Sequence, residues 1–522
     1  MIKTINQRWS KYHISILIVI AIAIFLRFFM LSNQSYWYDE GLSLVNSDVS
    51  TLQESIAKVR NITNSDRFQP FYFIVLFWWR QLFGESEFAV RSFSALLGIA
   101  SIILIFFTAL PIYGKKHAFW SLLLVTFSSF CVYYSQEARI YALAMFIASL
   151  QLYFFRKVLI NNGYHQGISK WLFAIFVGLG IFTNINICAF TAALCLSHIA
   201  IYRNFKQWLQ WWIPAALLSL PSIIYHLTLR GATDPDTIAV SRSGFPIIQN
   251  ILFVIHGLLV GTTYGPSMEL LRDENRVQVI LNHWPYILLL LIVTSVIFWA
   301  LLRVLLKQKQ HHNREQQSDR FFASVLVIAF LLGLVLAIAT KFNWVPRHSY
   351  YLWLPLAMLI PSTFIHRYSF SSKTDGISQL AQIAAILLIV LNIYSLSNYY
   401  FNEDYRKDDY RSAVQYLIKN QSPSTQSVLF GSQRLVRYYG DTRTQEINAL
   451  ANKLKKSTLK GTLAKEVQKV TNNADVVLFA VNREHLFGKG LIEKQMSALY
   501  KVDEQVSFPY INIYRFSKKK NS

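Results

Sequence analysis

Long apolar runs separated by short charged segments dominate this sequence. About 20 apolar residues are enough for a helix to cross the hydrocarbon core of a bilayer, so we interpret runs of roughly this size as membrane spans. The pattern predicts eleven spans: residues 14–32, 91–112, 118–134, 140–156, 171–185, 187–203, 208–229, 284–306, 321–340, 350–366 and 376–400. A polytopic, mainly α-helical bundle is therefore expected.

Two further apolar runs are too short to be assigned by length: PFYFIVLFWWRQLFG from Pro70 and PIIQNILFVIHGLLVG from Pro246. If the run at Pro70 crossed the membrane, Lys115 and Lys116 would face outside while the basic amino terminus faced inside, against the positive-inside rule. We therefore expect both runs to be interfacial helices on the outer surface. The membrane domain then has eleven spans, and it would have up to 13 if both short runs crossed. The amino terminus is then cytoplasmic and the carboxyl terminus extracytoplasmic.

The hydrophobic period changes after residue 401. YRSAVQYLIKN has the pattern of an amphipathic helix, whereas SVLF, ADVVLFAVN and YINIYRF are typical of short strands. Two domains are expected: a transmembrane domain over 1–401 with outer loops 33–90 and 230–283, and a small extracytoplasmic α/β domain over 402–522.

Composition supports a membrane protein and narrows its partners. The 522 residues are 53% hydrophobic, more than one soluble core of this size would bury. The formal net charge is +23, but the basic residues are dispersed and no nucleic-acid motif accompanies them, so anionic lipids and phosphate-bearing substrates are the expected partners. Three cysteines inside apolar runs provide neither a disulfide framework nor a metal motif.

The predicted topology brings three polar clusters to the outer membrane boundary. They are Asp39 and Glu40 after the first span, YYSQEARIYA from Tyr133 and NWVPRHSYY from Asn343. A pocket there would hold carboxylates, cations and tyrosines: Asp39, Glu40, Glu137, Gln136, Arg139, Arg347, His348, Tyr72, Tyr350 and Tyr351. A carboxylate base beside fixed positive charge suits an enzyme that deprotonates a hydroxyl while a lipid-linked phosphate departs. Arg347 is a natural phosphate clamp because a guanidinium binds phosphate in bidentate fashion.

Each cluster also has a purely structural interpretation. Asp39 and Glu40 are typical of acids in the first turn of a surface helix, and Glu137 with Arg139 could form a local ion pair. Arg347 and His348 could be interfacial anchors. Asp234 and Asp236 in GATDPDTIAV allow a divalent metal, but Asp and Pro are ordinary turn formers and no metal is otherwise indicated.

Four stretches together resemble a known family: YWYDEGLSL, FQPFYFIVLFWWRQLFGESEFAVRSFSALLG, YYSQEARIYALAMFIASLQLYFFRK and RHSYYLWLPLAMLIP. They are similar to the dolichyl-phosphate-mannose protein mannosyltransferase-like and aminoarabinose-transferase-like enzymes, glycosyltransferase family 39 in the broad sense, with a GT-C fold. The resemblance implies a polyprenyl-phosphate sugar donor, Asp39 as base with Glu40 in support, Glu137 in the second-loop acidic region, and Arg347 on the donor phosphate. The family's His-Pro-Pro-Leu-Tyr-Tyr stretch is FQPFYF here, which keeps Pro70 and Tyr72 but lacks the histidine.

The function expected from these observations is sugar transfer from a polyprenyl phosphate to a lipid, glycan or protein acceptor on the outer face of a bacterial cytoplasmic membrane, with inversion at the anomeric carbon. A transporter or flippase of a lipid-linked sugar could use the same cationic pocket without chemistry. Transporters often contain paired repeats and mid-membrane broken helices, and no repeat is visible in this sequence. A third alternative is a non-catalytic membrane subunit.

Overall fold

The computed structural model describes residues 2–62, 65–161, 167–229, 247–267, 270–273, 275–306, 314–340, 344–365, 376–447, 462–484 and 490–519. Asp234 and Asp236 lie outside these residues. By internal contacts the chain divides into two compact units. The transmembrane unit comprises 1–29, 49–267 and 277–401, and the second unit comprises 30–48, 268–276 and 402–522.

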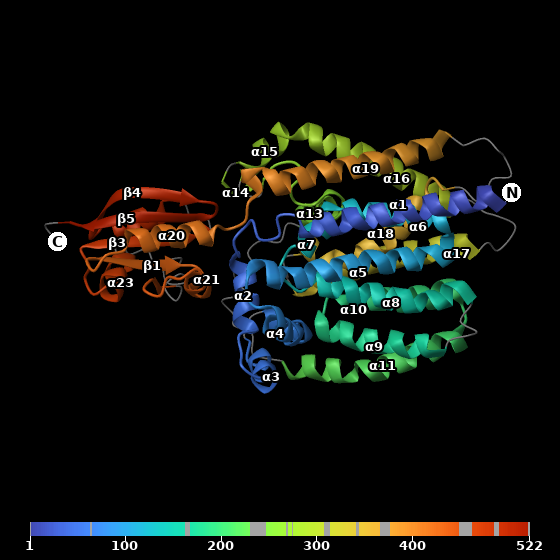
Figure 1. Cartoon of the computed structure of the whole chain (residues 1–522), viewed down its shortest axis with the longest axis horizontal. Helices are drawn as coiled ribbons and strands as arrows, with labels where there is room; N and C mark the ends of the chain where they lie inside the picture. Colours follow the sequence, from blue (N-terminus) through green and yellow to red (C-terminus); the bar gives the residue numbers. More distant parts are fainter. Residues whose placement is uncertain are drawn as a thin grey trace. The chain divides into compact units, whose positions relative to one another are not determined.

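Helices build the transmembrane unit, and the longest of them lie side by side in Figure 1. In chain order they are α1 Ile2–Phe28, α3 Leu52–Arg60, η1 Ser65–Phe68, α4 Pro70–Phe83, α5 Glu87–Tyr113, α6 Lys115–Phe127, α7 Ser129–Ser135, α8 Tyr141–Asn161, α9 Gly167–Thr183, α10 Ile187–Tyr202, α11 Phe205–Thr228, α13 Ile247–Val260, α15 Arg276–Asn282, α16 Trp284–Leu306, α17 Arg314–Thr340, η2 Pro346–Leu352, α18 Trp353–Ser362 and α19 Gly376–Phe401.

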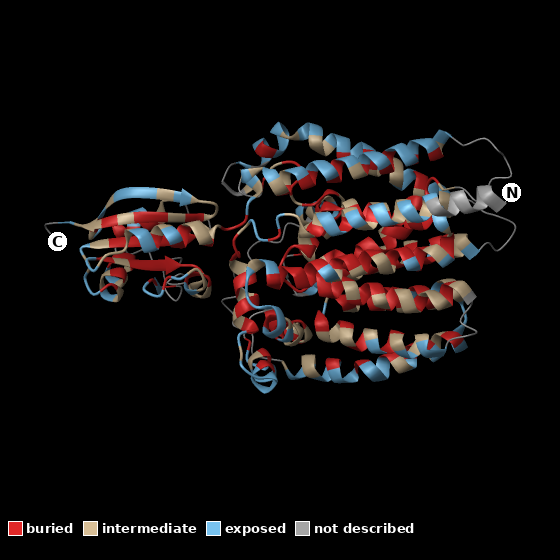
Figure 2. Cartoon of the chain, in the orientation of Figure 1, coloured by how far each residue is buried: buried red, intermediate tan, exposed pale blue. Residues whose placement is uncertain are grey.

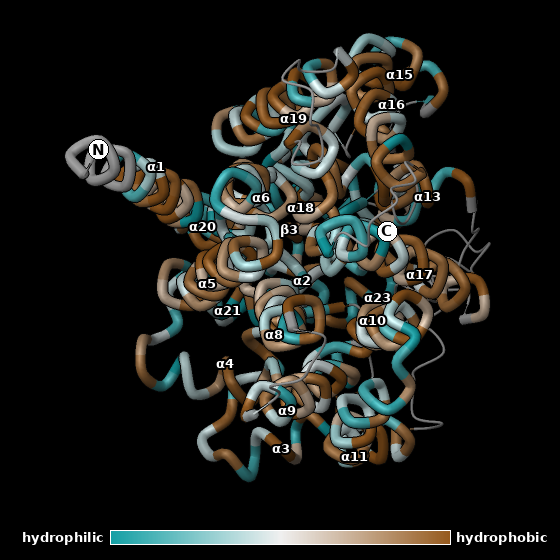
Figure 3. Tube along the Cα trace, turned by 90° about the vertical axis from the view of Figure 1, so that its right-hand side faces the viewer, coloured by the Kyte–Doolittle hydropathy of each residue, from teal (hydrophilic) through white to brown (hydrophobic). Residues whose placement is uncertain are grey.

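Six of these helices are long and apolar enough to cross a membrane, and α6 with α7 forms a seventh if the two, bent by 59°, count as one span. Their outer surfaces are apolar yet uncovered: only 22% of the apolar window of α16 is buried, and Leu288, Leu291 and Phe298 are exposed. Figures 2 and 3 show these exposed, hydrophobic outer helices. Because a water-facing surface of this kind would be strongly unfavourable, the chain is an integral membrane protein.

The two short apolar runs form α4 and α13, each of 14 residues. A helix of that length is about 21 Å long, less than the roughly 30 Å hydrocarbon core. Pro70 stands at the first helical position of α4, where its missing N–H costs no hydrogen bond. The predicted run 350–366 begins within η2 and continues into the ten-residue α18. Six or seven helices therefore have the length and composition of membrane spans. The other spans of the predicted eleven stay a prediction.

The second unit contains a five-stranded mixed sheet in the order β2-β1-β3-β5-β4. Its elements are α2 Tyr38–Asn46, α14 Leu270–Asp273, η3 Glu403–Tyr405, α20 Tyr410–Asn420, β1 Thr425–Phe430, α21 Gln433–Tyr438, β2 Gln445–Glu446, α23 Thr462–Val470, β3 Val476–Asn482, α24 Leu491–Met496, β4 Tyr500–Phe508 and β5 Ile511–Lys518. β1 pairs parallel with β2 and β3, while β5 is antiparallel to both β3 and β4. Val477, Phe479 and Phe516 belong to its buried core.

Candidate functional site

The predicted site residues are divided between the two units. Asp39 and Glu40 belong to the second unit, whereas Arg347, Arg139, His348, Glu137, Gln136, Tyr72, Tyr350 and Tyr351 belong to the transmembrane unit.

Asp39 and Glu40 occupy the first turn of α2, but their environments differ. Glu40 is fully buried, and its Oε2 accepts a hydrogen bond of 3.3 Å from the backbone N–H of Trp37, the N-cap residue. Glu40 thus satisfies a backbone donor that the helix itself cannot satisfy. Asp39 is half-buried. Of the two carboxylates, Asp39 is therefore the better placed to receive a proton from a substrate.

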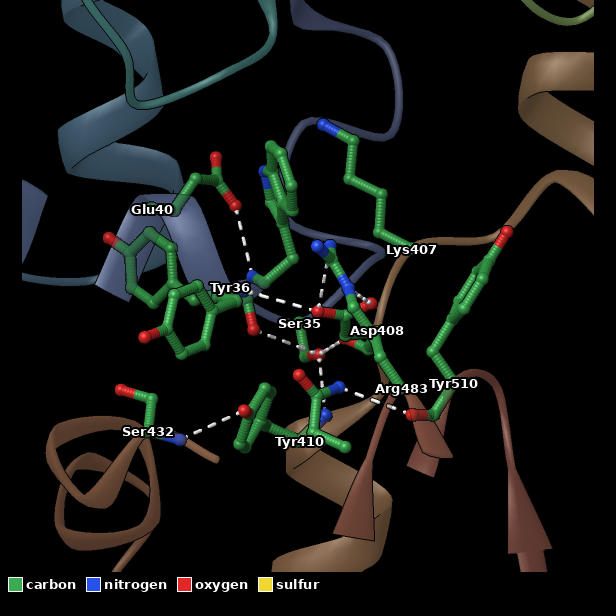
Figure 4. A network of polar contacts seen from close by, with 12 residues as sticks. Ser35, Tyr36, Glu40, Lys407, Asp408, Tyr410, Ser432, Arg483 and Tyr510 are labelled. Atoms are coloured by element: carbon green, nitrogen blue, oxygen red, sulfur yellow. Dashed lines mark hydrogen bonds and ion pairs between the residues drawn. The ribbon is translucent and has the colours of Figure 1, made fainter. Parts of the chain in front are cut away.

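The peptide leading into α2 lies along the segment that precedes α20 (Figure 4). Ser35 Oγ donates to the carbonyl oxygen of Asp408 at 2.8 Å and accepts from the backbone N–H of Tyr410 at 3.1 Å. The backbone N–H of Tyr36 donates to the Tyr439 hydroxyl at 2.8 Å. These hydrogen bonds join residues about 370 to 400 positions apart, so the carboxyl-terminal segment fixes the start of α2.

Asp408 and Arg483 form the ion pair at the centre of this network. Arg483 Nε lies 3.3 Å from Asp408 Oδ1, and its second guanidinium nitrogen lies 3.2 Å from Oδ2. Asp408 Oδ2 also accepts from the backbone N–H of Tyr38, at 3.3 Å. Burial lowers the pKa of Arg483, but the carboxylates of Asp408 and Asp39 more than offset this, so the pKa is raised. Asp39 therefore interacts electrostatically with the guanidinium of Arg483. Arg483 belongs to the part of the second unit that contains the five-stranded sheet, residues 402–522, which we call the sheet domain.

Sequence analysis missed Asp408 and Arg483. The charged stretch NEDYRKDDYR immediately after the last apolar run was the available signal for Asp408. Arg483 follows a strand with no distinguishing motif, and only the fold brings it to α2.

In the transmembrane unit, Gln136 is occupied by a structural role. Its Nε2 donates to the carbonyl oxygens of Leu26, Arg27 and Phe29 at 3.1, 3.2 and 2.9 Å, at the carboxyl end of α1. In return, Arg27 donates to the carbonyls of Val125 and Thr126 at 3.2 and 3.4 Å, where α6 ends before the bend. Each side chain satisfies helix-terminal carbonyls that have no intrahelical partner.

Arg139 forms a buried ion pair with Asp66, a residue that sequence analysis also missed. The two guanidinium nitrogens lie 2.8 and 3.3 Å from the two carboxylate oxygens, and the side chains are 6% and 2% exposed. A buried pair of this kind is costly to break because one charge is left uncompensated. Asp66 therefore neutralises Arg139 and connects η1 to the start of α8.

Glu137 and Tyr72 are both buried. Glu137 interacts electrostatically with Tyr133, and the Tyr133 ring lies 5.2 Å from that of Tyr399 in α19. Tyr72 lies on α4, with its ring 6.4 Å from that of Phe93. Phe68, in the place of the family's histidine, stacks on His226 at 6.1 Å. Tyr72 therefore packs against the aromatic rings of Phe73 and Phe93.

η2 carries Arg347, His348, Tyr350 and Tyr351. The His348 Nδ1 accepts from the backbone N–H of Val345 at 3.3 Å, which leaves the ring hydrogen on Nε2. Burial, with a smaller contribution from Arg347, lowers the pKa of His348 well below its usual value, so the ring is neutral. Tyr350 and Tyr351 are buried. Tyr350 lines a small cavity of about 20 Å³ together with Arg27 and Cys131, which has room for a water but not for a sugar.

Among the described residues, no group of three or more His, Cys, Asp or Glu side chains is placed to hold a metal ion.

Comparisons with known proteins match part of the transmembrane unit to one family model and the chain to several solved structures. Residues 69–228, from the N-cap of α4 to the end of α11, match the family model described as dolichyl-phosphate-mannose-protein mannosyltransferase. No curated protein matches the chain. Among solved structures, apo ArnT from Cupriavidus metallidurans is similar at 13% identity and a TM-score of 0.47, covering 96% of this chain and 97% of that one. AglB from Archaeoglobus fulgidus, solved with an inhibitory peptide and a dolichol-phosphate, is similar at 11% identity and a TM-score of 0.48, covering 98% and 75%. The resemblance to the mannosyltransferase family that the motifs indicated is thus confirmed, by the family model, over residues 69–228.

Proposed function

We propose that this chain is a membrane glycosyltransferase of GT-C type that transfers a sugar from a polyprenyl-phosphate donor to a lipid, glycan or protein acceptor on the outer face of a bacterial cytoplasmic membrane. The proposal includes eleven spans, a cytoplasmic amino terminus, a transmembrane domain over 1–401 and an extracytoplasmic domain over 402–522. The match of residues 69–228 to the mannosyltransferase family carries the proposal. The half-buried Asp39 carboxylate, fixed at the start of α2, supplies the chemical group that such a reaction needs.

In the proposed reaction, Asp39 takes the proton from an acceptor hydroxyl or amine as the acceptor atom attacks the anomeric carbon. The bond from that carbon to the phosphate oxygen breaks on the opposite side, so the configuration inverts. The polyprenyl phosphate leaves with the electron pair. Arg347 binds the phosphate in bidentate fashion, and fixed positive charge of this kind stabilises the departing group.

The remaining predicted residues take supporting roles in this proposal. His348, neutral and with its hydrogen on Nε2, donates a hydrogen bond to a phosphate oxygen and adds no charge. Arg139 contributes to the phosphate site while retaining Asp66 as its partner. Glu137, Tyr72, Tyr350 and Tyr351 shape the substrate pocket, and Glu40 supports Asp39 by capping α2.

The test is release of free polyprenyl phosphate from labelled polyprenyl-phosphate hexose and pentose by purified protein, with a membrane extract as the acceptor source. Wild type is expected to release polyprenyl phosphate, and Asp39→Asn is expected to reduce turnover by at least about 10³-fold while donor binding is retained, because the general base is lost. Asp404→Asn, which removes an exposed carboxylate of the same unit, is the matched control and keeps full turnover. Normal turnover by Asp39→Asn contradicts the assigned base, and a wild type that is inert with every donor contradicts the transferase.

A further inference from the structure

Arg483 has an unusual backbone conformation for its position. It directly follows β3 with φ of 55°, in the left-handed region that non-glycine residues rarely adopt. Its backbone N–H donates at 2.8 Å to the carbonyl oxygen of Tyr510. Tyr510 lies in the turn between β4 and β5 and is itself left-handed, with φ of 58°. Strain of this kind is retained where the surrounding structure needs a side chain in one particular direction.

That direction brings Arg483 to the start of α2 (Figure 4). The guanidinium carbon lies 5.3 Å from the ring centroid of Trp37, the residue that caps α2, and Lys407 Nζ lies 5.8 Å from the same ring. Both distances are within the range of a cation–π contact. The sheet domain therefore holds the peptide immediately before Asp39 with two cations.

Arg483 also connects two carboxylates. It forms the bidentate pair with Asp408, whose Oδ2 is held in turn by the backbone N–H of Tyr38. Asp39, the next residue after Tyr38, interacts electrostatically with the same guanidinium. Because Asp408 is only 2% exposed while the Arg483 side chain is 24% exposed, the guanidinium is anchored from its buried side and retains an accessible edge.

We propose that Arg483 is a positioning residue for Asp39: it keeps the carboxylate ionised and oriented as the base, which makes the sheet domain part of the catalytic machinery. This inference rests on the proposed function, in which Asp39 takes the acceptor proton. The mannosyltransferase match ends at residue 228 and does not include Arg483.

The charged and titratable groups around Asp39 determine the expected pH behaviour. Glu40 and Tyr38 come from α2, Lys407 and Asp408 from the segment before α20, Tyr410 from α20, and Arg483 from the end of β3. From α21 and the residue after it come Arg434, which pairs with Asp48 beyond the other end of α2, and Tyr439, which binds the backbone N–H of Tyr36. Asp408 accepts a hydrogen bond from the backbone N–H of Tyr38, the residue before Asp39, and Glu40 is the residue after it. Without the guanidinium, less positive charge offsets these two carboxylates. Like charges disfavour ionisation, so the base becomes protonated at a higher pH.

The experiment compares Arg483→Gln, Arg483→Lys and, as a matched control, Arg437→Gln in the full-length protein, with polyprenyl-phosphate hexose as the donor. Arg437 is an exposed arginine of α21 in the same unit. Arg483→Gln is expected to lower kcat by about 10²-fold, as a small misplacement of a catalytic group does, with the donor KM changed less than about threefold. The acid limb of its pH–rate profile is expected to shift to higher pH. Arg483→Lys keeps the charge but loses the bidentate geometry, so it is expected to lose only about tenfold and to keep the wild-type acid limb.

Thermal unfolding and donor binding establish that each variant is folded. If Arg483→Gln is unstable, the test rests on Arg483→Lys. A kcat of Arg483→Lys equal to that of wild type, with an unchanged pH profile, overturns the inference. Full activity of a folded Arg483→Gln overturns it as well. Those outcomes leave the proposed function intact as long as wild type releases polyprenyl phosphate and Asp39→Asn does not.

Discussion

His348 is a residue whose charge state is determined by the fold. Burial and Arg347 lower its pKa well below the ordinary histidine value, whereas in the unfolded chain it binds a proton below about pH 6.5. Its contribution to stability is therefore complete above pH 6.5 and decreases as pH falls below that value, by about 1.4 kcal/mol per pH unit. Between pH 7.5 and 5.5, His348→Gln is expected to lose less thermal stability in detergent than wild type does. His13→Gln, at an exposed position, is the control and behaves as wild type; an equal loss in His348→Gln and wild type would show that His348 titrates normally in the fold.

For single residues, the sequence could indicate which side chains are candidates for the site but not which side chains they contact. Asp39 stood out because it follows an apolar run beside aromatic residues, and its role stays a prediction. Gln136 stood out for the same kind of reason, yet its amide caps the end of α1. The partner of Arg139 is Asp66, 73 residues away, and no local pattern connects the two. Polar partners chosen by tertiary packing leave no periodic signal in the sequence.

Two elements, α13 and η2, are in close contact beside Arg347. An added Cβ at Gly257 of α13 would lie 2.3 Å from Pro346 Cγ, and Pro346 precedes Arg347 directly. A proline ring cannot rotate away, so Gly257→Ala has to displace η2 or α13, at a cost of about 1–3 kcal/mol in stability. We expect the donor KM to rise by about tenfold as Arg347 moves. Gly376→Ala, where an added Cβ meets nothing within 4 Å, should change neither quantity; an unchanged KM in Gly257→Ala would mean that Arg347 does not contact the donor.

Elements with a strong period were predicted well. The helix YRSAVQYLIKN is α20, residue for residue, and the predicted strands ADVVLFAVN and YINIYRF contain β3 and most of β5, so these predictions are confirmed. β4 was missed because it is a polar edge strand, YKVDEQVSF, most of whose side chains are not buried. The bend between α6 and α7 was also missed. It falls at Ser128, which caps α7 by accepting a hydrogen bond from the backbone N–H of Cys131 at 3.2 Å, inside a run that is apolar on both sides.

The two compact units of the whole molecule are not separated by a single boundary in the chain, because the second unit is built from three separate segments. Residues 30–48 group with 402–522 because hydrogen bonds such as that from Ser35 to Asp408 join segments 373 positions apart. The sequence pattern shows that the hydrophobic period changes at residue 402. It cannot show that residues 30–48 pack with the residues that follow this change. The peptide that carries Asp39 is consequently supported by residues that are synthesised last, which is the physical basis for the proposed role of Arg483.

The topology is the last property that the sequence predicts and that a measurement on the whole molecule can decide. If α4 lies at the interface, Lys116 faces the cytoplasm; if α4 crosses, Lys116 faces outside. α4 has 14 residues and is about 21 Å long, too short to cross unaided, so we expect the cytoplasmic location. In a variant lacking Cys131, Cys188 and Cys195, a membrane-impermeant maleimide should label Ser497→Cys in spheroplasts and Lys116→Cys only after permeabilisation. Labelling of Lys116→Cys from outside would mean that α4 spans the bilayer, and the cytoplasmic placement of the segments after α5 and α8 would have to be revised with it.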